Sequence, residues 1–343
     1  MRYLLISAIW LLACNNHPAN YQIDLIRQDS GTTASLRGLD VVDAKTAWAS
    51  GAKGTVLRTT DGGVTWQDVS IPAADSLDFR DIEAFSATEA VIMNAGFPGV
   101  ICKTDDGGKN WELVYQDLRP QIFFDAMDFW DENSGIAFGD AIDGHIVIIT
   151  TIDGGASWQQ LAPEMSPAAL QGEGGFAASG TCITTFGDSS VWIALGTPKS
   201  RVLHSANRGN SWQVINTPMA QAAAGAGIFS LEFSSARYGI AIGGNYQLPN
   251  DTTKVISLTH DGGKSWKLLS GSGLNGFKSA ITNIPTSNNW LCAGTSGVNF
   301  SSDNGNTWNL VDSTGYHTIR MADNNLGWLS GGNGRIAKIV IRH

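Results

Sequence analysis

Short apolar runs separated by turn residues recur along most of the chain. In the first complete unit they span residues 36–42, 47–51, 55–60 and 65–71. Each run has the length of a β-strand and is too short for an ordinary helix. The 40 glycines among 343 residues point the same way, because glycine weakens helices. The pattern therefore predicts an all-β protein built from four-stranded units, whose strands we call a to d in chain order.

One eight-residue phrase lies between strands c and d and occurs six times. It reads Ser/Thr-x-Asp-x-Gly-x-x-Trp, with Asn replacing Asp in the fourth copy. The copies span residues 59–66, 104–111, 151–158, 205–212, 259–266 and 301–308. Their tryptophans are 45, 47, 54, 54 and 42 residues apart. Four-stranded units repeated at this spacing are typical of the blades of a β-propeller.

The two ends of the chain predict the number of blades. After the sixth phrase, residues 318–321, 327–330 and 335–341 supply strands a, b and c of one more unit. Residues 21–27 have the pattern of a strand that belongs to no unit of its own. Pairing this strand with the last three completes a seventh blade and leaves no open sheet edge. We therefore predict a seven-bladed propeller over residues 21–343, closed by its N-terminal strand.

Turn chemistry explains the repeated phrase. Its aspartate accepts hydrogen bonds from turn amides, and the glycine in fifth place allows a positive φ. The tryptophan then opens strand d and covers the neighbouring blade. No metal is expected here, because the loops lack the alternating carboxylates and terminal glutamate of a calcium loop. The residues in third place are thus assigned a structural role: Asp61, Asp106, Asp153, Asn207, Asp261 and Asp303.

This phrase resembles the Asp-box, or BNR, repeat. The mature chain resembles the BNR propellers akin to the photosystem II stability/assembly factors, and in particular a bacterial branch that is often labelled oxidoreductase. Residues 77–81, 139–144, 176–181, 227–230 and 243–246 carry the likeness to that branch. The resemblance implies a propeller that acts as a protein-binding or assembly-factor-like scaffold. A propeller fold by itself implies no particular activity.

The N-terminal segment has the pattern of a lipoprotein signal peptide over residues 1–13. A basic start and an apolar run precede Cys14, and residues 11–14 resemble a bacterial lipobox. Cys14 is the predicted lipidation site, and residues 14–20 form a tether. We expect an exported protein, anchored to a bacterial cell membrane on the periplasmic or outer side, that contacts the membrane only through this lipid.

Composition narrows the chemistry further. Acidic residues number 31 and basic residues 22, which gives a net charge of −9 and disfavours nucleic acid as a partner. Residues 172–177 match GxGxxA, but no helix pattern follows, so they do not predict a dinucleotide site. The cysteines and histidines lack the spacing of a metal site. We therefore expect no cofactor.

An Asp-box glycoside hydrolase, sialidase-like or glucan-active, is the alternative function. Sialidases carry an Arg-Ile-Pro segment and a Tyr/Glu pair. Here residues 283–285 read Asn-Ile-Pro, and no tyrosine has an evident glutamate partner. Two carboxylates ~5–9.5 Å apart across a pocket would favour the hydrolase. No catalytic residue is assigned, and a binding scaffold is favoured.

Propeller geometry predicts which face binds a partner. The b–c and d–a connections and the starts of strand a share one face, which we call the loop face. The longer connections, residues 140–145, 170–175, 216–227 and 245–254, fall on it, and binding residues are common on such loops. An envelope protein or a glycan is the expected partner. The candidate ligand-binding residues are Arg37, Arg80, Asp81, Asp125, Asp140, Asp143, His145, Glu173, Ser179, Ser230, Asn245 and Tyr246.

Overall fold

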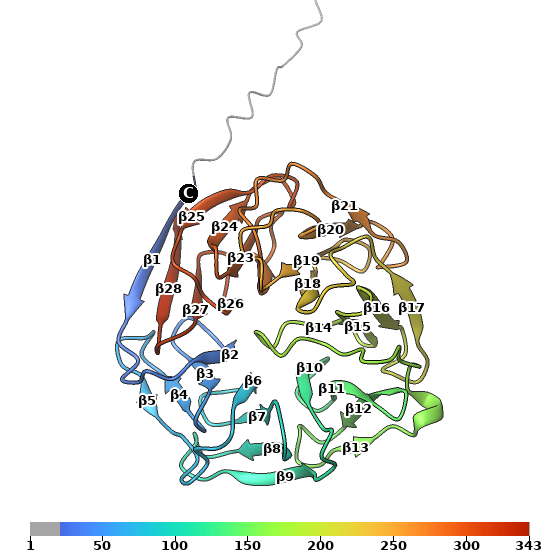
Figure 1. Ribbon diagram of the computed structural model, residues 1–343. Coiled ribbons are helices and arrows are strands. Elements are labelled where there is room, and N and C mark those ends of the chain that lie inside the picture. Colours follow the sequence, from blue (N-terminus) through green and yellow to red (C-terminus); the bar gives the residue numbers. More distant parts are fainter. Residues whose placement is uncertain (1–20, 343) are drawn as a thin grey trace, which may run out of the picture.

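A ring of seven four-stranded antiparallel sheets surrounds a central pore in the computed structural model, which describes residues 21–342 (Figure 1). In each sheet strand a lies at the pore and strand d lies on the rim. The predicted all-β, seven-bladed propeller is therefore confirmed. The predicted signal peptide, the tether and Cys14 lie outside the described residues.

The strands of every blade follow one another from a to d in chain order, except that the N-terminal strand is strand d of blade seven. Blades one to four contain β2 (Leu36–Val41), β3 (Ala47–Gly51), β4 (Val56–Thr59), β5 (Gln67–Asp68); β6 (Phe79–Ala84), β7 (Ala90–Asn94), β8 (Gly99–Thr104), β9 (Glu112–Asp117); β10 (Phe124–Phe129), β11 (Gly135–Ile142), β12 (His145–Thr151), β13 (Gln159–Gln160); and β14 (Ile183–Phe186), β15 (Ser190–Ala194), β16 (Arg201–Ser205), β17 (Gln213–Asn216). Blades five to seven contain β18 (Ala226–Phe233), β19 (Gly239–Asn245), β20 (Ile256–Thr259), β21 (Lys267–Leu268); β22 (Ala280–Asn283), β23 (Trp290–Gly294), β24 (Gly297–Ser301), β25 (Asn309–Asp312); and β26 (Thr318–Met321), β27 (Leu326–Ser330), β28 (Ile336–Arg342), β1 (Gln22–Gln28). A short 3₁₀ turn, Pro163–Met165, lies between β13 and β14.

Burial decreases from the middle of each blade to its rim. Strand β3 is buried at every position, whereas both residues of β5 are exposed. Neighbouring blades cover both faces of the middle strands, so these strands need no polar face. The largest side chains buried in this way are tryptophans of b strands: Trp48, Trp192, Trp290 and Trp328.

The rim strand of blade one is shorter than the sequence predicts. The pattern predicts strand d of blade one over residues 65–71, but the ladder covers only Gln67–Asp68. Just beyond it, the Ser70 hydroxyl accepts the Val56 N–H at 3.0 Å and takes the place of a ladder bond. Strand d has a neighbour on one side only, so a single side chain of this kind ends the pairing. Strand b has two neighbours and matches its predicted range of 47–51.

Hydrogen bonds in the c–d hairpins agree with the predicted turn chemistry. In the first hairpin, the two carboxylate oxygens of Asp61 accept the Thr65 N–H at 3.0 Å and the Thr65 hydroxyl at 2.6 Å. Gly63 has a φ of 83° and donates its N–H to the Thr59 hydroxyl. The Thr65 hydroxyl and amide lower the pKa of Asp61 to about 2. This stabilisation is present above pH 3.8 and is lost as the pH falls through about 2.

The hairpin tryptophans pack on the preceding blade, as the sequence predicts. Trp111 of blade two donates its indole N–H to the Val69 carbonyl of blade one at 2.8 Å. Its ring also meets Trp48 of blade one edge to face, with centroids 6.3 Å apart. The repeated phrase therefore both turns its own hairpin and fixes the contact between neighbouring blades.

The N-terminal strand closes the ring. Strand β1 pairs antiparallel with β28, from Gln22 opposite Arg342 to Gln28 opposite Ile336 (Figure 1). At the end of β1, Gln28 Oε1 accepts the indole N–H groups of Trp66 and Trp328 at 3.0 and 3.1 Å. Gln28 therefore joins blade seven to blade one, and the predicted closure is confirmed.

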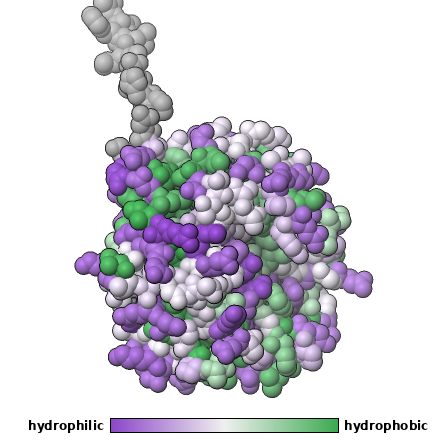
Figure 2. All heavy atoms as spheres, turned by 60° about the vertical axis from the view of Figure 1, so that its left-hand side comes forward, coloured by the Kyte–Doolittle hydropathy of each residue, from purple (hydrophilic) through white to green (hydrophobic). Residues whose placement is uncertain are grey.

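The flank that lies on the left in Figure 1 has a mixed surface. Figure 2 shows hydrophilic and hydrophobic residues interspersed on this flank. Rim strands of the ring carry scattered exposed apolar side chains, such as Ile26, Leu113 and Leu310. Single residues of this kind are normal on protein surfaces and do not indicate a docking site. Within residues 21–342, no helix is long and apolar enough to cross a bilayer.

Removal of the closing strand should destabilise the whole ring. A chain that begins at residue 29 loses every β1–β28 pair, and we expect its Tm to be lower by about 10 °C or more than that of a chain beginning at residue 21. Gln28→Ala leaves two indole N–H groups without this acceptor. This variant should also have a lower Tm, but by less than the truncated chain. Arg27→Ala, at an exposed position of the same strand, is the control. Thermal unfolding monitored by tryptophan fluorescence tests this, and equal Tm values for all four proteins would show that closure does not hold the ring.

Candidate functional site

A pocket with a volume of about 380 Å³ opens at the pore on the loop face. The starts of inner strands from several blades form its walls, together with part of the connection between β13 and β14. Its volume lies in the range of small-ligand sites, roughly 300–1,000 Å³. The lining residues are Arg37, Arg80, Phe123, Gly175, Phe176, Ala177, Ala178, Phe229, Tyr246, Phe277, Ser279, Thr295 and His317.

Four aromatic rings pack together in the wall of this pocket. Phe176 and Phe229 stack with centroids 3.8 Å apart and an interplanar angle of 6°. Phe277 meets Phe229 edge to face at 4.6 Å, and Tyr246 does so at 6.3 Å. Tyr246 remains 51% exposed, whereas Phe229 is buried. The rings therefore form a fixed apolar wall with an amphipathic residue at its open edge.

Two arginines line the pocket from adjacent blades. Arg37 and Arg80 occupy the second positions of β2 and β6. Burial, and then the charge of Arg80, lower the pKa of Arg37. The same two charges contribute, after burial, to lowering the pKa of His317 to about 3, so this imidazole is neutral near pH 7. No lining residue is acidic, so Arg37 and Arg80 supply the charged groups of the pocket lining.

Residues 174–181, which we call the plug, reach from the connection before β14 toward the centre of the ring (Figure 1). The plug carbonyls of Ala177 and Ala178 accept hydrogen bonds from Arg80 and Arg37 at 3.4 and 3.0 Å. The Ser179 hydroxyl donates to the carbonyl of Ser279 at 2.7 Å. From the adjacent blade seven, Thr318 Oγ1 donates to the Ser179 carbonyl at 3.0 Å. The plug is therefore held by blades one, two, six and seven and forms part of the pocket wall.

One glycine lets the plug approach the inner strands. Gly180 has a φ of 70°, and a Cβ on it would lie 2.1 Å from Oδ1 of Asp81. Any other residue here would be strained by the left-handed backbone conformation, and its side chain would clash with this carboxylate. The close approach brings Thr181 within 2.7 Å of the Ser230 hydroxyl, to which it donates.

Buried acidic groups hold the start of the plug. Asp125 is fully buried and accepts the Gly175 N–H at 3.2 Å. Burial, followed by the charge of the neighbouring Asp140, raises the pKa of Asp125 well above its ordinary value. Burial also raises the pKa of Asp140 to about 6. Just before the plug, Glu173 forms a buried ion pair with Arg201.

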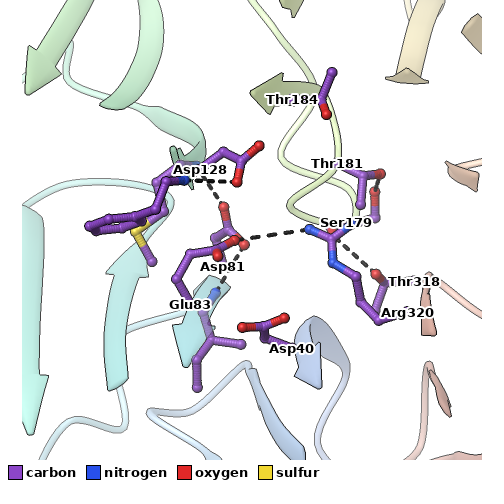
Figure 3. A network of polar contacts seen from close by, with 12 residues as sticks. Asp40, Asp81, Glu83, Asp128, Ser179, Thr181, Thr184, Thr318 and Arg320 are labelled. Atoms are coloured by element: carbon purple, nitrogen blue, oxygen red, sulfur yellow. Dashed lines mark hydrogen bonds and ion pairs between the residues drawn. The ribbon is translucent and has the colours of Figure 1, made fainter. Parts of the chain in front are cut away.

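A cluster of charged side chains lies in the pore beyond the plug (Figure 3). Arg320 of β26 points toward Glu83 of β6, with 4.0 Å between Nη2 and Oε1. Burial by itself would lower the pKa of Arg320, but Glu83 and three neighbouring aspartates raise it. Burial is also the main cause that raises the pKa values of two pore glutamates. It raises the pKa of Glu83 well above its ordinary value and that of Glu232 to about 7. The pore thus contains more acidic groups than this arginine neutralises.

These pore carboxylates have a structural explanation. Four of them accept a backbone N–H from strand a of the following blade, at 2.6–3.0 Å: Asp40 from Ala84, Asp81 from Met127, Asp128 from Thr185, and Glu232 from Asn283. Each bond ties two adjacent inner strands together. Among the described residues, no group of three or more His, Cys, Asp or Glu side chains has the arrangement of a metal site.

The predicted binding residues occupy several different places. Three line the pocket (Arg37, Arg80 and Tyr246), and five support the plug and its approach (Asp125, Asp140, Glu173, Ser179 and Ser230). Asp81 belongs to the pore cluster, and Asn245 caps a turn by accepting the Gln247 N–H. Asp143 and His145 line a separate depression of about 270 Å³. The predicted set therefore combines residues that line the pocket with residues that support the fold.

The expected loop over residues 140–145 is instead a tight hairpin. Strand β11 continues to Ile142 and β12 begins at His145. Only Asp143 and Gly144 form the turn, with φ values of 51° and 82°. Two consecutive positive φ values suit a two-residue hairpin, and Asp-Gly is a preferred pair there. Asp140 accordingly belongs to a strand, where its carboxyl reaches Asp125.

The three phenylalanines of the aromatic wall and His317 are missing from the sequence-based prediction. Phe229 lies in the apolar run of β18, and apolar runs in strands usually indicate core. Phe176 lies in the plug, and no local sequence pattern predicts that the plug crosses the pore. His317 directly precedes β26 and Phe277 lies three residues before β22, so both are near the start of a strand a, as Arg37 and Arg80 are. The sequence analysis considered only polar residues near the starts of the a strands. Had it considered every residue type there, it would have included these two residues.

The fold and the repeated hairpins have counterparts among known proteins. The family model for "Photosynthesis system II assembly factor YCF48" matches residues 22–122. A solved structure described as YCF48 bound to D1 peptide is 19% identical, with a TM-score of 0.66 and coverage of 96% of this chain and 96% of that chain. YCF48 from Cyanidioschyzon merolae is 18% identical, with a TM-score of 0.65 over 93% and 98% of the two chains. The chain is a BNR-type seven-bladed propeller that resembles this assembly factor.

More distant propellers have the same architecture. The WD40 propeller domain of Doa1 is 12% identical, with a TM-score of 0.62 and coverage of 93% of this chain and 96% of that chain. A search of curated proteins gave no significant match. At identities this low, the structural likeness establishes the fold, while function depends on the site.

The Asp125–Asp140 pair predicts how stability depends on pH. Because the pKa of Asp140 is raised to about 6, its contribution is present below pH 3.8 and is lost as the pH rises through about 6. Asp140→Asn should therefore reduce the fall in Tm between pH 5 and pH 7. Asp143→Asn, at the exposed turn of the same hairpin, is the control and should follow the wild type. Calorimetry at half-unit pH steps measures this, and identical pH profiles for the two variants would contradict the assignment.

Proposed function

We propose that this protein is an extracytoplasmic, lipid-anchored scaffold that binds a segment of a partner protein in the loop-face pocket. The observation that carries the proposal is the pocket itself, in which a stacked aromatic wall lies beside two arginines at the mouth of the pore. Aromatic residues and arginine are the types that contribute most binding energy at protein interfaces. The YCF48 structure described as bound to D1 peptide supports a peptide as the ligand class.

The loop face also offers apolar surface next to the pocket. Tyr246 and Leu248, in the connection between β19 and β20, are 51% and 57% exposed. Tyr246 lines the pocket, so a partner segment bound there would extend over this connection. Exposed apolar groups that adjoin a polar and aromatic pocket favour a protein partner over a glycan, which needs more hydrogen-bonding groups.

The hydrolase alternative has less support from the pocket. A glycosidase of the usual kind needs two carboxyl groups on either side of the bond it cleaves. No lining residue of the loop-face pocket is acidic. The pore carboxylates of Asp40, Asp128 and Glu232 accept backbone N–H groups that tie blades together. Turnover of a sialoside or a β-glucan by the purified protein would favour the hydrolase over the scaffold.

Site-specific cross-linking tests the proposed binding face. A photo-reactive phenylalanine analogue in place of Tyr246 should cross-link to a discrete partner in cells, because this side chain lies at the open edge of the pocket. The control places the same analogue at Ile152, which is 85% exposed in a c–d hairpin on the opposite face. Mass spectrometry identifies the products. Cross-linking from position 152 and none from position 246 would place the partner on the other face and contradict the proposal.

Membrane fractionation tests the proposed anchor. Cys14→Ala removes the predicted lipidation site, and we expect the chain to leave the membrane fraction, because stable attachment depends on its acyl chains. Metabolic labelling with a clickable fatty acid should mark the wild type and leave this variant unlabelled. Cys102→Ala, at a buried cysteine, is the control and should remain labelled. A processed Cys14→Ala chain that still pellets with membranes would contradict the lipoprotein assignment.

A further inference from the structure

The two pocket arginines have donors that no protein group uses. Arg37 donates from Nη1 to Ala178, and Arg80 donates from Nε to Asp78 and from Nη1 to Ala177. Within residues 21–342, Nη2 of both arginines has no hydrogen-bond partner. A planar guanidinium with free donors is suited to a carboxylate or phosphate group.

The charges around these donors also favour an anion. Asp78 is the only carboxylate that forms an ion pair with either arginine in the described part of the chain. It pairs with Arg80, and its charge also raises the pKa of Arg37, though less than burial and Arg80 lower it. Burial and the neighbouring Arg80 charge act against the charged form of Arg37, which lowers its pKa. A bound anion would relieve this repulsion. A pocket lined by two arginines and no acidic residue is a local exception in a protein with a net charge of −9.

The aromatic wall limits which anion fits. Phe229 and Tyr246 belong to blade five, and Phe277 lies three residues before β22 of blade six, whereas the arginines belong to blades one and two. A ligand that satisfies both sides must carry an anionic group and an apolar group that point in different directions. Inorganic phosphate would leave the wall uncovered, and an uncharged apolar ligand would leave both Nη2 groups without acceptors.

We propose that the pocket binds the free C-terminal end of a partner polypeptide, with the terminal carboxylate on Arg37 and Arg80 and an apolar last side chain against Phe229 and Tyr246. This rests on the proposed function and adds the chemical class of the bound segment. In a C-terminal residue, the carboxylate and the side chain leave the same Cα in different directions, as the two sides of the pocket require. Plug residues from Gly175 to Ala178 line the pocket and interrupt the pore, so a chain end fits more readily than a chain that must enter and leave.

Binding of defined peptides to the full chain tests this inference. The probes are fluorescein-labelled hexapeptides of one Gly/Ser sequence, with the last residue varied among leucine, phenylalanine, valine, alanine, lysine and aspartate. Each is compared with its C-terminal amide by fluorescence anisotropy. We expect the free acids ending in leucine or phenylalanine to bind best, and their amides to bind about 10- to 100-fold more weakly, because a charge-assisted hydrogen-bond pair is lost. Affinity for the acids should also fall as salt increases.

Variants of the chain separate the parts of the site. Arg37→Gln and Arg80→Gln should each remove most of the preference for acid over amide, whereas Tyr246→Ala should weaken both forms. Arg37→Lys keeps the charge without the planar fork and should restore the preference only in part. Arg237→Gln, at an exposed arginine in the a–b turn of blade five on the opposite face, is the matched control and should bind like the wild type. Tm values for all variants show whether the fold is kept.

Each outcome bears on the inference. Equal affinity for acids and amides, or unchanged binding by Arg37→Gln and Arg80→Gln, overturns the carboxylate assignment and leaves the proposed scaffold intact if cross-linking at position 246 succeeds. Tighter binding of a hexapeptide amide with an internal aspartate–phenylalanine pair overturns the assignment to a chain end. Binding of 3-phenylpropionate as tight as that of the best peptide indicates a small-molecule site and overturns the polypeptide class. Binding of none of the free acids overturns the inference outright.

Discussion

Blades of a propeller contact only their neighbours, so the ring is stable only when its first and last blades are joined. In this protein the join is the antiparallel pairing of β1 with β28. Gln28 strengthens it, because its amide oxygen accepts one indole N–H from blade one and one from blade seven. The loop-face pocket depends on this closure. Its arginines belong to blades one and two, and His317 directly precedes β26 of blade seven, on opposite sides of the join.

Inside the ring, polar bonds between blades replace apolar packing. Asp40, Asp128 and Glu232 each accept an N–H from the next inner strand. Burying ionised groups is costly, and the raised pKa of Glu232, about 7, reflects that cost. Arg320 offsets part of it by its charge, and the pore leaves this side chain 23% exposed to solvent. The carboxylates therefore hold the inner strands in register at some expense of stability at neutral pH.

Local sequence signals predicted the fold well and the site only in part. The six repeated phrases determine hairpins through bonds within eight residues, so blade number and closure could be inferred from spacing alone. Arg37, Arg80 and Tyr246 were found because their places in the repeat put them on the loop face. The path of residues 174–181 across the pore could not be inferred, because bonds such as that of Ser179 with Ser279 join residues far apart in sequence. For the same reason, the sequence could not indicate that Asp125 supports the start of the plug, where it accepts the Gly175 N–H.

The plug also determines how ready the pocket is to bind. An unliganded arginine normally samples many rotamers, and fixing them reduces binding affinity. Here the plug carbonyls of Ala177 and Ala178 each engage one N–H of an arginine, which restrains both guanidinium groups before a ligand arrives. The stacked ring of Phe176, also from the plug, restrains Phe229 in the same way. A segment that closes the pore thus preorganises both the polar and the apolar side of the pocket, so most of the ordering cost of binding falls on the ligand.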